Sequence, residues 1–154
     1  MFKRIVVGTD GSVGANIAVD AAIELARLSG ATLHVVNAFK AMSAYNLATA
    51  AEVGIAPVDV AETNEAILAQ GQRFCDQAAE RAGRVGVHTE THCVADDAAD
   101  ALMRVAKDTE ADLLVVGNRG MSGARRFVLG SVPNKVSHHC PSSLLIVDTS
   151  EARA

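Results

Sequence analysis

The residues whose types and spacing are best suited to binding a ligand lie between Gly117 and Ser131, in the sequence GNRGMSGARRFVLGS. An apolar run typical of a buried strand precedes this segment. The sequence SVPNKVSHH follows it and predicts a helix with Ser131 at the N-cap. A glycine-rich loop between a strand and a helix leaves backbone N–H groups free, and the helix N-terminus adds partial positive charge. The segment therefore predicts a phosphate-binding site.

Positive charge is concentrated in the same region. The chain from Leu113 to Val147 contains no Asp or Glu. The cationic residues in it are Arg119, Arg125, Arg126 and Lys135. This stretch carries +4, whereas the whole chain carries −4. An acidic chain that excludes carboxylates from one glycine-rich region is expected to hold an anion there, although solvated arginines on a surface loop are the alternative.

Length and composition limit the classes of protein. A chain of 154 residues is expected to form one domain with a sizeable core. Of its residues 49% are hydrophobic but only 3% aromatic, and this aliphatic, Ala-rich composition suits a parallel sheet covered by helices. The negative charge and the few aromatic residues argue against nucleic acid as a partner. No apolar run is long enough for a membrane span or a signal peptide, so we expect no membrane partner and a cytoplasmic location.

Two groups of side chains resemble metal ligands: His88, Glu90 and His92, which alternate along one predicted strand, and the run His138-His139-Cys140. An edge strand with a wet face explains the first group, and a helix C-terminus, whose dipole favours His, explains the second. The three cysteines are too widely spaced for a disulfide framework or a C-x2-C pair. We therefore expect no metal site.

Strand-like and helix-like runs alternate five times along the chain. The predicted strands are Phe2–Thr9, Thr32–Phe39, Val87–Val94, Asp112–Gly117 and Ser143–Val147. The predicted helices run from Ser12 to Gly30, from about Glu62 to Arg84, from Asp96 or Asp97 onward, and from Ser131 onward. This alternation predicts an α/β fold: a single doubly wound, Rossmann-like domain whose five-stranded parallel sheet has helices on both faces. The third strand is polar on both faces, which predicts a sheet edge.

The apolar spacing of each helix predicts the face that it buries. The residues expected to face the sheet are Ile17, Ala21, Leu25 and Leu28 in the first helix, Ile67, Gly71, Phe74, Ala78 and Ala82 in the second, and Ala98, Ala101, Leu102, Val105 and Ala106 in the third.

Two of the predicted strands end in segments suited to a ligand. The first strand ends in Gly8-Thr9-Asp10-Gly11-Ser12, and the fourth ends in the glycine-rich loop. Because ligands of doubly wound sheets bind at the carboxyl ends of the strands, both segments are expected at one rim. The long connection Lys40–Ala61 reaches the same rim and is either a lid or a surface excursion.

Four pieces of the sequence, IVVGTDGS, ADLLVVGNRG, LGSV and CPSSLLIVD, resemble the universal stress protein family in order and spacing. The resemblance covers essentially the whole chain, and the spacing G-x2-G-x9-G-[S/T] is similar to that of the members that bind ATP. It implies a domain over residues 1–148 with a short polar tail at 149–154. It also implies an adenine nucleotide, ATP with or without Mg²⁺, and a homodimer formed through the last strand.

The resemblance also implies roles for single residues. Gly117 and Gly120 would lie by the ribose and phosphates, Gly130 and Ser131 would hold phosphate, and Asp10 would lie against the ribose and base. The backbone near Ala38 would contact the adenine edge. The full set of expected nucleotide-binding residues is Gly8, Thr9, Asp10, Ala38, Gly117, Asn118, Arg119, Gly120, Met121, Ser122, Gly123, Arg126, Gly130, Ser131 and Val132.

Three positions depart from the family pattern. Asp96 and Ala98 stand where the family often has Gly and Pro, and Asn37 stands where a His is common. The first of these departures places an extra carboxylate on the nucleotide rim. None of them touches the predicted phosphate loop.

Catalysis finds less support in the sequence than nucleotide binding. The chain has no Walker A motif, no G-x-G-x2-G after the first strand and no evident Ser-His-Asp arrangement, which argues against a fast NTPase or a dehydrogenase. We expect a nucleotide-binding regulatory protein of the stress response, without catalytic residues. Slow ATP hydrolysis or autophosphorylation, and a protein that binds cyclic AMP or AMP, are the alternatives.

Overall fold

The sheet of this protein has five parallel strands in the order β3-β2-β1-β4-β5. The computed structural model describes residues 1–43, 59–118 and 129–150. The strands are β1 (Arg4–Gly8), β2 (Thr32–Phe39), β3 (Thr89–Ala95), β4 (Leu113–Gly117) and β5 (Ser143–Val147). The helices of the described part are α1 (Val13–Ser29), α3 (Val60–Arg84), α4 (Ala98–Asp108) and α5 (Ser131–His139). This is the doubly wound α/β fold that the alternating pattern predicted, with β3 at one edge as expected.

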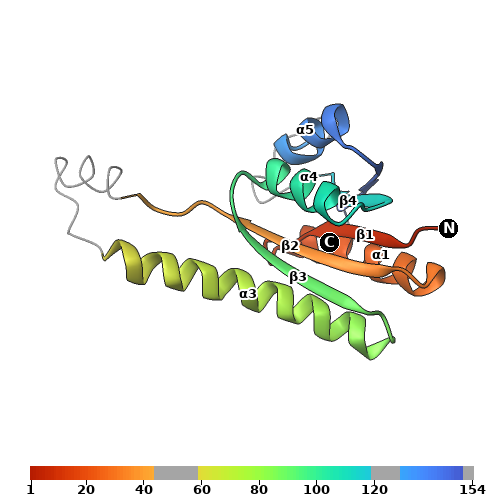
Figure 1. The fold of residues 1–154 in the computed structure, drawn as a ribbon, viewed down its shortest axis with the longest axis horizontal. Helices are drawn as coiled ribbons and strands as arrows, with labels where there is room; N and C mark the ends of the chain where they lie inside the picture. Colours follow the sequence, from red (N-terminus) through yellow and green to blue (C-terminus); the bar gives the residue numbers. More distant parts are fainter. Residues whose placement is uncertain (44–58, 119–128, 151–154) are drawn as a thin grey trace.

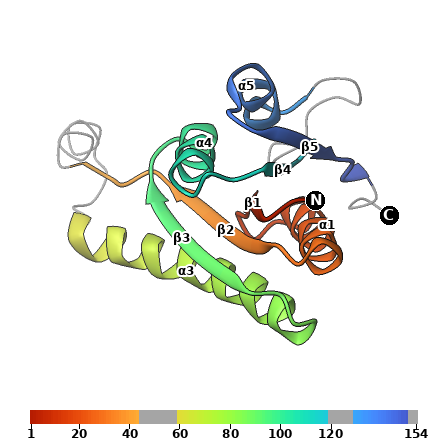
Figure 2. The ribbon, with the colours of Figure 1, turned by 45° about the vertical axis from the view of Figure 1, so that its right-hand side comes forward.

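The helices form a layer on each face of the sheet, α1 and α3 on one and α4 and α5 on the other (Figures 1 and 2). The strands serve both layers because successive side chains point to opposite faces. Ile5 and Val7 of β1 pack under α1, whereas Val6 between them packs under α4. All three are completely buried, which explains why the central strands are continuous apolar runs.

Helix α1 begins and ends where the sequence predicts. The Ser12 side chain accepts a hydrogen bond from the Ala15 amide, and Gly30 ends the helix in the left-handed conformation, with φ +68°. The predicted buried face was wrong in part: Leu25 packs partly buried against the core, but Leu28 is 62% exposed. The buried residues are Ala18, Val19, Ala22, Ile23 and Ala26. Ala18, Ala22 and Ala26 let the helix approach the sheet closely, and Val19 and Ile23 are the larger buried side chains.

The start of α5 also differs from the prediction. Gly130, not Ser131, is the N-cap, with an extended backbone, and Ser131 is the first helical residue. In α4 the cap is Asp97, whose carboxylate accepts from the Ala99 amide. The expected faces of α3 and α4 are largely confirmed, with Cys75 and Ala99 added to the buried residues.

Within the described ranges, no helix has both the length and the apolar character needed to cross a bilayer.

Candidate functional site

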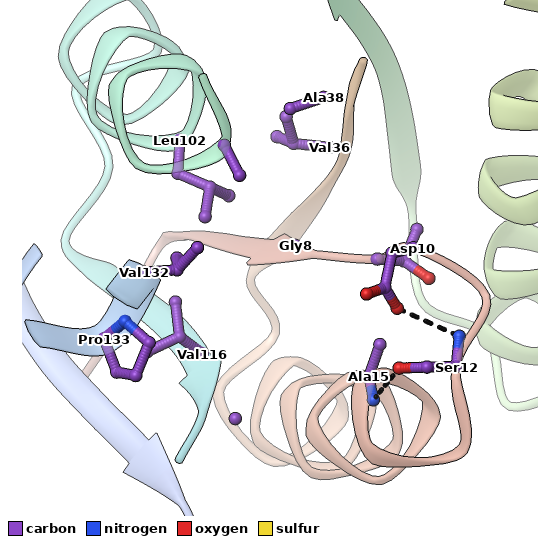
Figure 3. A pocket seen from close by; sticks show the side chains of 13 residues that line it. Gly8, Asp10, Ser12, Ala15, Val36, Ala38, Leu102, Val116, Val132 and Pro133 are labelled. Carbon is purple, nitrogen blue, oxygen red and sulfur yellow. Dashed lines mark hydrogen bonds between the residues drawn. The ribbon is translucent and has the colours of Figure 1, made fainter. Parts of the chain in front are cut away.

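A pocket opens at the carboxyl ends of β1, β2 and β4, between the first turns of α1, α4 and α5 (Figure 3). Its volume is about 610 Å³ with the open solvent at its mouth included. The lining residues are Gly8, Thr9, Asp10, Ser12, Ala15, Val36, Ala38, Ala98, Leu102, Val116, Gly117, Val132 and Pro133. The rim predicted from the sequence is therefore the rim where the structure has its pocket.

The expected nucleotide-binding residues fall into three groups. Those that line the pocket are Gly8, Thr9, Asp10, Ala38, Gly117 and Val132. Those that adjoin it in the chain without lining it are Asn118, Gly130 and Ser131. Those that lie outside the described residues are Arg119, Gly120, Met121, Ser122, Gly123 and Arg126. The Lys40–Ala61 connection lies mostly outside them too, with residues 44–58 undescribed.

Sequence reasoning missed most of the pocket walls. They are the side chains of Ser12, Ala15, Val36, Ala98, Leu102, Val116 and Pro133. Most are apolar residues that a sequence pattern assigns to the core. The available signal was their position, because each lies at a strand end or in the first turns of a helix that begins at the rim.

Gly8 lets β1 and α4 approach each other under the pocket. A Cβ atom at Gly8 would lie 3.2 Å from both δ-carbons of Leu102. The missing side chain therefore brings Leu102 against the strand, and Val36 and Ala38 of β2 lie beside it in Figure 3. The result is an apolar wall that suits a flat ring.

Two polar residues at the end of β1 are held in place by their neighbours. The Thr9 carbonyl accepts from Nδ2 of the buried Asn37 at 2.8 Å, and the Thr9 amide donates to the Val36 carbonyl at 2.8 Å. Asp10 Oδ1 accepts from the Ser12 amide at 2.9 Å (Figure 3). The second oxygen of Asp10 has no protein partner among the described residues, and this carboxylate lines the pocket.

The glycine at position 11 is required by the turn after Asp10. Its φ is +75°, and a Cβ atom there would collide with the ring of Phe74 in α3. The turn therefore packs against α3 without a side chain of its own.

The N-terminus of α5 is the part of the site best suited to an anion. Gly130 provides no side-chain cap, in contrast to Ser12 for α1 and Asp97 for α4. The first hydrogen bond within α5 runs from the Asn134 amide to the Gly130 carbonyl at 3.0 Å. The amides of Ser131 and Val132 precede it, and such first-turn N–H groups bind anions readily.

Lys135 does not supply its charge to the pocket. Its ammonium lies 2.6 Å from Asp100 Oδ2 and 3.4 Å from Asp97 Oδ1. The hydrogen bond to Asp100 is the main cause that raises the pKa of Lys135. The extra carboxylate noted at position 96 is likewise paired, with Arg104 at 3.2 Å. Lys135, one of the four positive charges counted in the sequence, therefore joins α5 to α4 through these ion pairs.

Asn118, which follows β4, is hydrogen-bonded to residues at the end of β5 and just after it. Its Oδ1 accepts from the Thr149 amide at 3.1 Å and from the Thr149 hydroxyl at 2.7 Å, and its Nδ2 donates to Asp148 at 2.8 Å. Its amide donates to the Val147 carbonyl at 2.8 Å. The side chain therefore fastens the residues that follow β5 and is fully engaged within the protein.

Comparison with known proteins agrees with this architecture. The model of the universal stress protein family matches residues 1–148. A universal stress protein of Bacillus subtilis is 31% identical over 147 residues, which cover 96% of this chain and 99% of that protein. One from Mycobacterium tuberculosis is 35% identical over 158 residues, covering 96% and 97%. A crystal structure of a universal stress protein in complex with cAMP is 32% identical, with a TM-score of 0.69, covering 97% of this chain and 98% of that one.

Proposed function

The chain belongs to the universal stress protein family, and we propose that its pocket binds an adenine nucleotide as a signal in the stress response. The observation that carries this proposal is the position of α5. Its N-terminus, without a side-chain cap, borders an apolar pocket at the carboxyl ends of the parallel strands. Anion-binding amides beside an apolar wall match the two ends of a nucleotide.

The proposed orientation follows from the chemistry of the lining. The base lies against Val36, Ala38 and Leu102, with the backbone near Ala38 at the adenine edge. The ribose lies near Asp10, whose second oxygen is available to a hydroxyl group. The phosphates lie toward Gly117 and the first turn of α5. There the glycine-rich segment supplies further amides and the two charges of Arg125 and Arg126.

ATP is the nucleotide that we propose, because the G-x2-G-x9-G-[S/T] spacing and the cationic segment suit several phosphates. Cyclic AMP is the second candidate. It is favoured by the crystal structure of a 32% identical universal stress protein in complex with cAMP. The two candidates differ in the charge that the loop must hold, so a direct comparison of their affinities separates them.

We propose that the protein holds the nucleotide and does not turn it over rapidly. Phosphoryl transfer needs an acid that binds the metal and a group that positions the nucleophile. Among the described lining residues, Asp10 is the carboxylate that could contact Mg²⁺ carried by ATP, and no second acid lines the pocket. Slow hydrolysis is the most that this arrangement supports.

A homodimer in the cytoplasm completes the proposal. Strand β5 pairs with β4 alone among the described strands, so its other edge is open to a partner. Such an edge favours association with a second strand. We assign residues 1–148 to the domain and residues 149–154 to a short polar tail, of which Thr149 is still bonded to Asn118.

Mass spectrometry of the nucleotide released by denaturing freshly purified protein tests the proposal. ATP or ADP supports it, whereas AMP or cyclic AMP favours the second candidate. If no nucleotide is released, calorimetric titration with each of them decides. Folded protein that binds none of the four contradicts nucleotide binding.

A further inference from the structure

A cluster of His and Glu side chains lies on β2 and β3, away from the nucleotide pocket. His34 of β2 is directly opposite Glu90 of β3 in the strand register, and His92 is the next residue on the same face of β3. The sequence had grouped Glu90 and His92 with His88 on a wet edge strand. The structure adds His34, which the sequence places more than fifty residues away.

The three side chains present ligand atoms at distances suited to one metal ion. His34 Nδ1 lies 3.2 Å from His92 Nε2 and 3.5 Å from Glu90 Oε2. One ligand atom from each side chain lies within 4.8 Å of the other two. A tetrahedral ion bound at about 2.0–2.2 Å holds its ligand atoms about 3.3–3.6 Å apart. Two of the three separations are therefore already close to those of a metal site.

One side of the cluster is buried at His34 and the other is exposed to solvent at Glu90. His34 is only 4% exposed, and its Nε2 atom is buried without a hydrogen-bond partner. The Glu90 side chain is 53% exposed. The unpartnered Nε2 is not the nitrogen that faces Glu90 and His92, so Nδ1 is the atom that His34 presents to a ligand. An open side toward solvent leaves room for water on a bound ion.

The charges around the cluster permit a cation. Arg4 is a basic residue whose charge acts on His34, and its guanidinium is paired with Glu110 at 3.2 Å. His88 Nε2 lies 3.9 Å from Glu90 Oε1, on the solvent side of the cluster. This ring nitrogen therefore lies near the carboxylate of the proposed site without belonging to the cluster.

We propose that His34, Glu90 and His92 form a site for one divalent cation of the zinc type, which joins the edge strand β3 to β2. Two imidazoles and one carboxylate are a ligand set that zinc accepts, with remaining positions for water. The site is distinct from the nucleotide pocket. His34 and Ala38 are four residues apart on β2, which corresponds to about 13 Å along a strand.

Calorimetric titration of Zn²⁺ into EDTA-treated, nucleotide-free protein tests this site. We expect one ion per chain, with affinity reduced by at least about tenfold in Glu90→Gln and in His92→Ala, since even outer partners of metal ligands contribute that much. Both side chains are partly exposed, so both variants are expected to fold. His139→Ala, an exposed histidine at the end of α5, is the matched control and is expected to bind as the wild type does.

The thermal melt gives a second readout that does not depend on heat of binding. At the same Zn²⁺ concentration, Zn²⁺ is expected to raise the melting temperature of the wild type and of His139→Ala by more than that of Glu90→Gln, because stabilisation by a ligand grows with its affinity for the folded state. A wild type that binds no Zn²⁺ overturns the proposal. Equal affinity in Glu90→Gln and His92→Ala, or an equal loss in His139→Ala, overturns it as well.

Discussion

The backbone amide of Gly130 donates a hydrogen bond to the carbonyl oxygen of Asn118 at 3.0 Å. This single bond joins the end of β4 to the start of α5 across the glycine-rich segment. Asn118 and Gly130, which flank this segment in the sequence, are therefore neighbours beside the pocket.

The same bond gives Gly130 its role as N-cap. Its amide is committed to Asn118 and its carbonyl accepts the first hydrogen bond of α5, so the next amides, of Ser131 and Val132, have no competing side-chain cap at the proposed anion site. A Ser131 cap, as the sequence had indicated, would have accepted from the Asn134 amide, because Pro133 has no N–H.

Arg126→Ala is expected to weaken ATP binding without unfolding the protein. Loss of a charge-assisted contact to phosphate costs about 1.5–3 kcal/mol of binding, whereas loss of an exposed arginine changes the unfolding free energy within about 0.5 kcal/mol. Arg125→Ala provides the alternative position. Lys135→Ala is the control, because Lys135 is paired with Asp97 and Asp100 and is expected to leave affinity unchanged. Wild-type affinity in both arginine variants, measured by calorimetry, would refute the cationic loop.

Two glycines of α3 are expected to respond to alanine in opposite directions. A Cβ at Gly71 would collide with Oδ1 of the buried Asn37, whereas a Cβ at Gly83 meets nothing within 4 Å. Gly71→Ala should lower the unfolding free energy by about 1–3 kcal/mol, and Gly83→Ala should raise it by about 0.5–1 kcal/mol, as helical alanine does. Urea denaturation measures both. Equal effects of the two changes would mean that Asn37 does not fill the space opposite Gly71.

Asp112→Asn is expected to remove a pH-dependent contribution to stability. The amides of Lys3 and Arg4 donate to Asp112 Oδ2 at 2.6 and 2.9 Å, and these bonds lower the pKa of the carboxyl below 3.8. A carboxyl whose pKa is lower in the folded state than in the unfolded state stabilises the fold at pH values above its unfolded-state pKa. This stabilisation is lost as the pH falls through the folded-state pKa. At pH 7 the variant should be less stable by about 1 kcal/mol. The difference in unfolding free energy between wild type and variant should vanish at pH values below the folded-state pKa of Asp112. A difference measured by urea denaturation that stays constant down to acid pH would contradict this.

Lysine on β5 is expected to disrupt the proposed homodimer. Leu145→Lys and Val147→Lys introduce charge at the open edge strand, and light scattering should show a shift from dimer to monomer. Both side chains also pack partly against the core cluster under α1, so some stability is expected to be lost. Cys93→Lys is the matched control, since it packs against the same cluster from β3 at the other edge. A wild type that is monomeric at tens of micromolar, or lysine variants that stay dimeric, would place the interface elsewhere or remove it.

Alternation along the chain was sufficient to predict the sheet, because each apolar run and each capped helix has a local signature. Ser12 and Gly30 mark α1 in the sequence as they do in the structure. The buried face of α1 could not be predicted in the same way. Alanine fills several sides of this helix, so apolar spacing alone does not distinguish Ala22 from Ala21, and packing against the sheet decides.

The sequence predicted the residues of the candidate site that follow the strands at the rim, but not the apolar side chains that form the walls of the pocket. Asp10 and Gly117 follow strands directly, and strand ends meet at one edge of a parallel sheet. Leu102 and Val36 resemble core residues in sequence, and only the contact through Gly8 places them around a cavity. The grouping of His34 with His92 depends on strand register, which a single sequence does not define.

Calorimetric titration of ATP into the wild type and into the double variant Gly130→Ala/Ser131→Ala tests the central claim most directly. The variant adds a methyl group in the phosphate path and removes a hydroxyl group, while the extended backbone of Gly130 is open to alanine. Ser137→Ala, later in the same helix, is the control. We predict that the wild type and the control bind ATP and that the double variant, folded by circular dichroism, does not. A folded double variant with unchanged affinity for ATP would contradict the site.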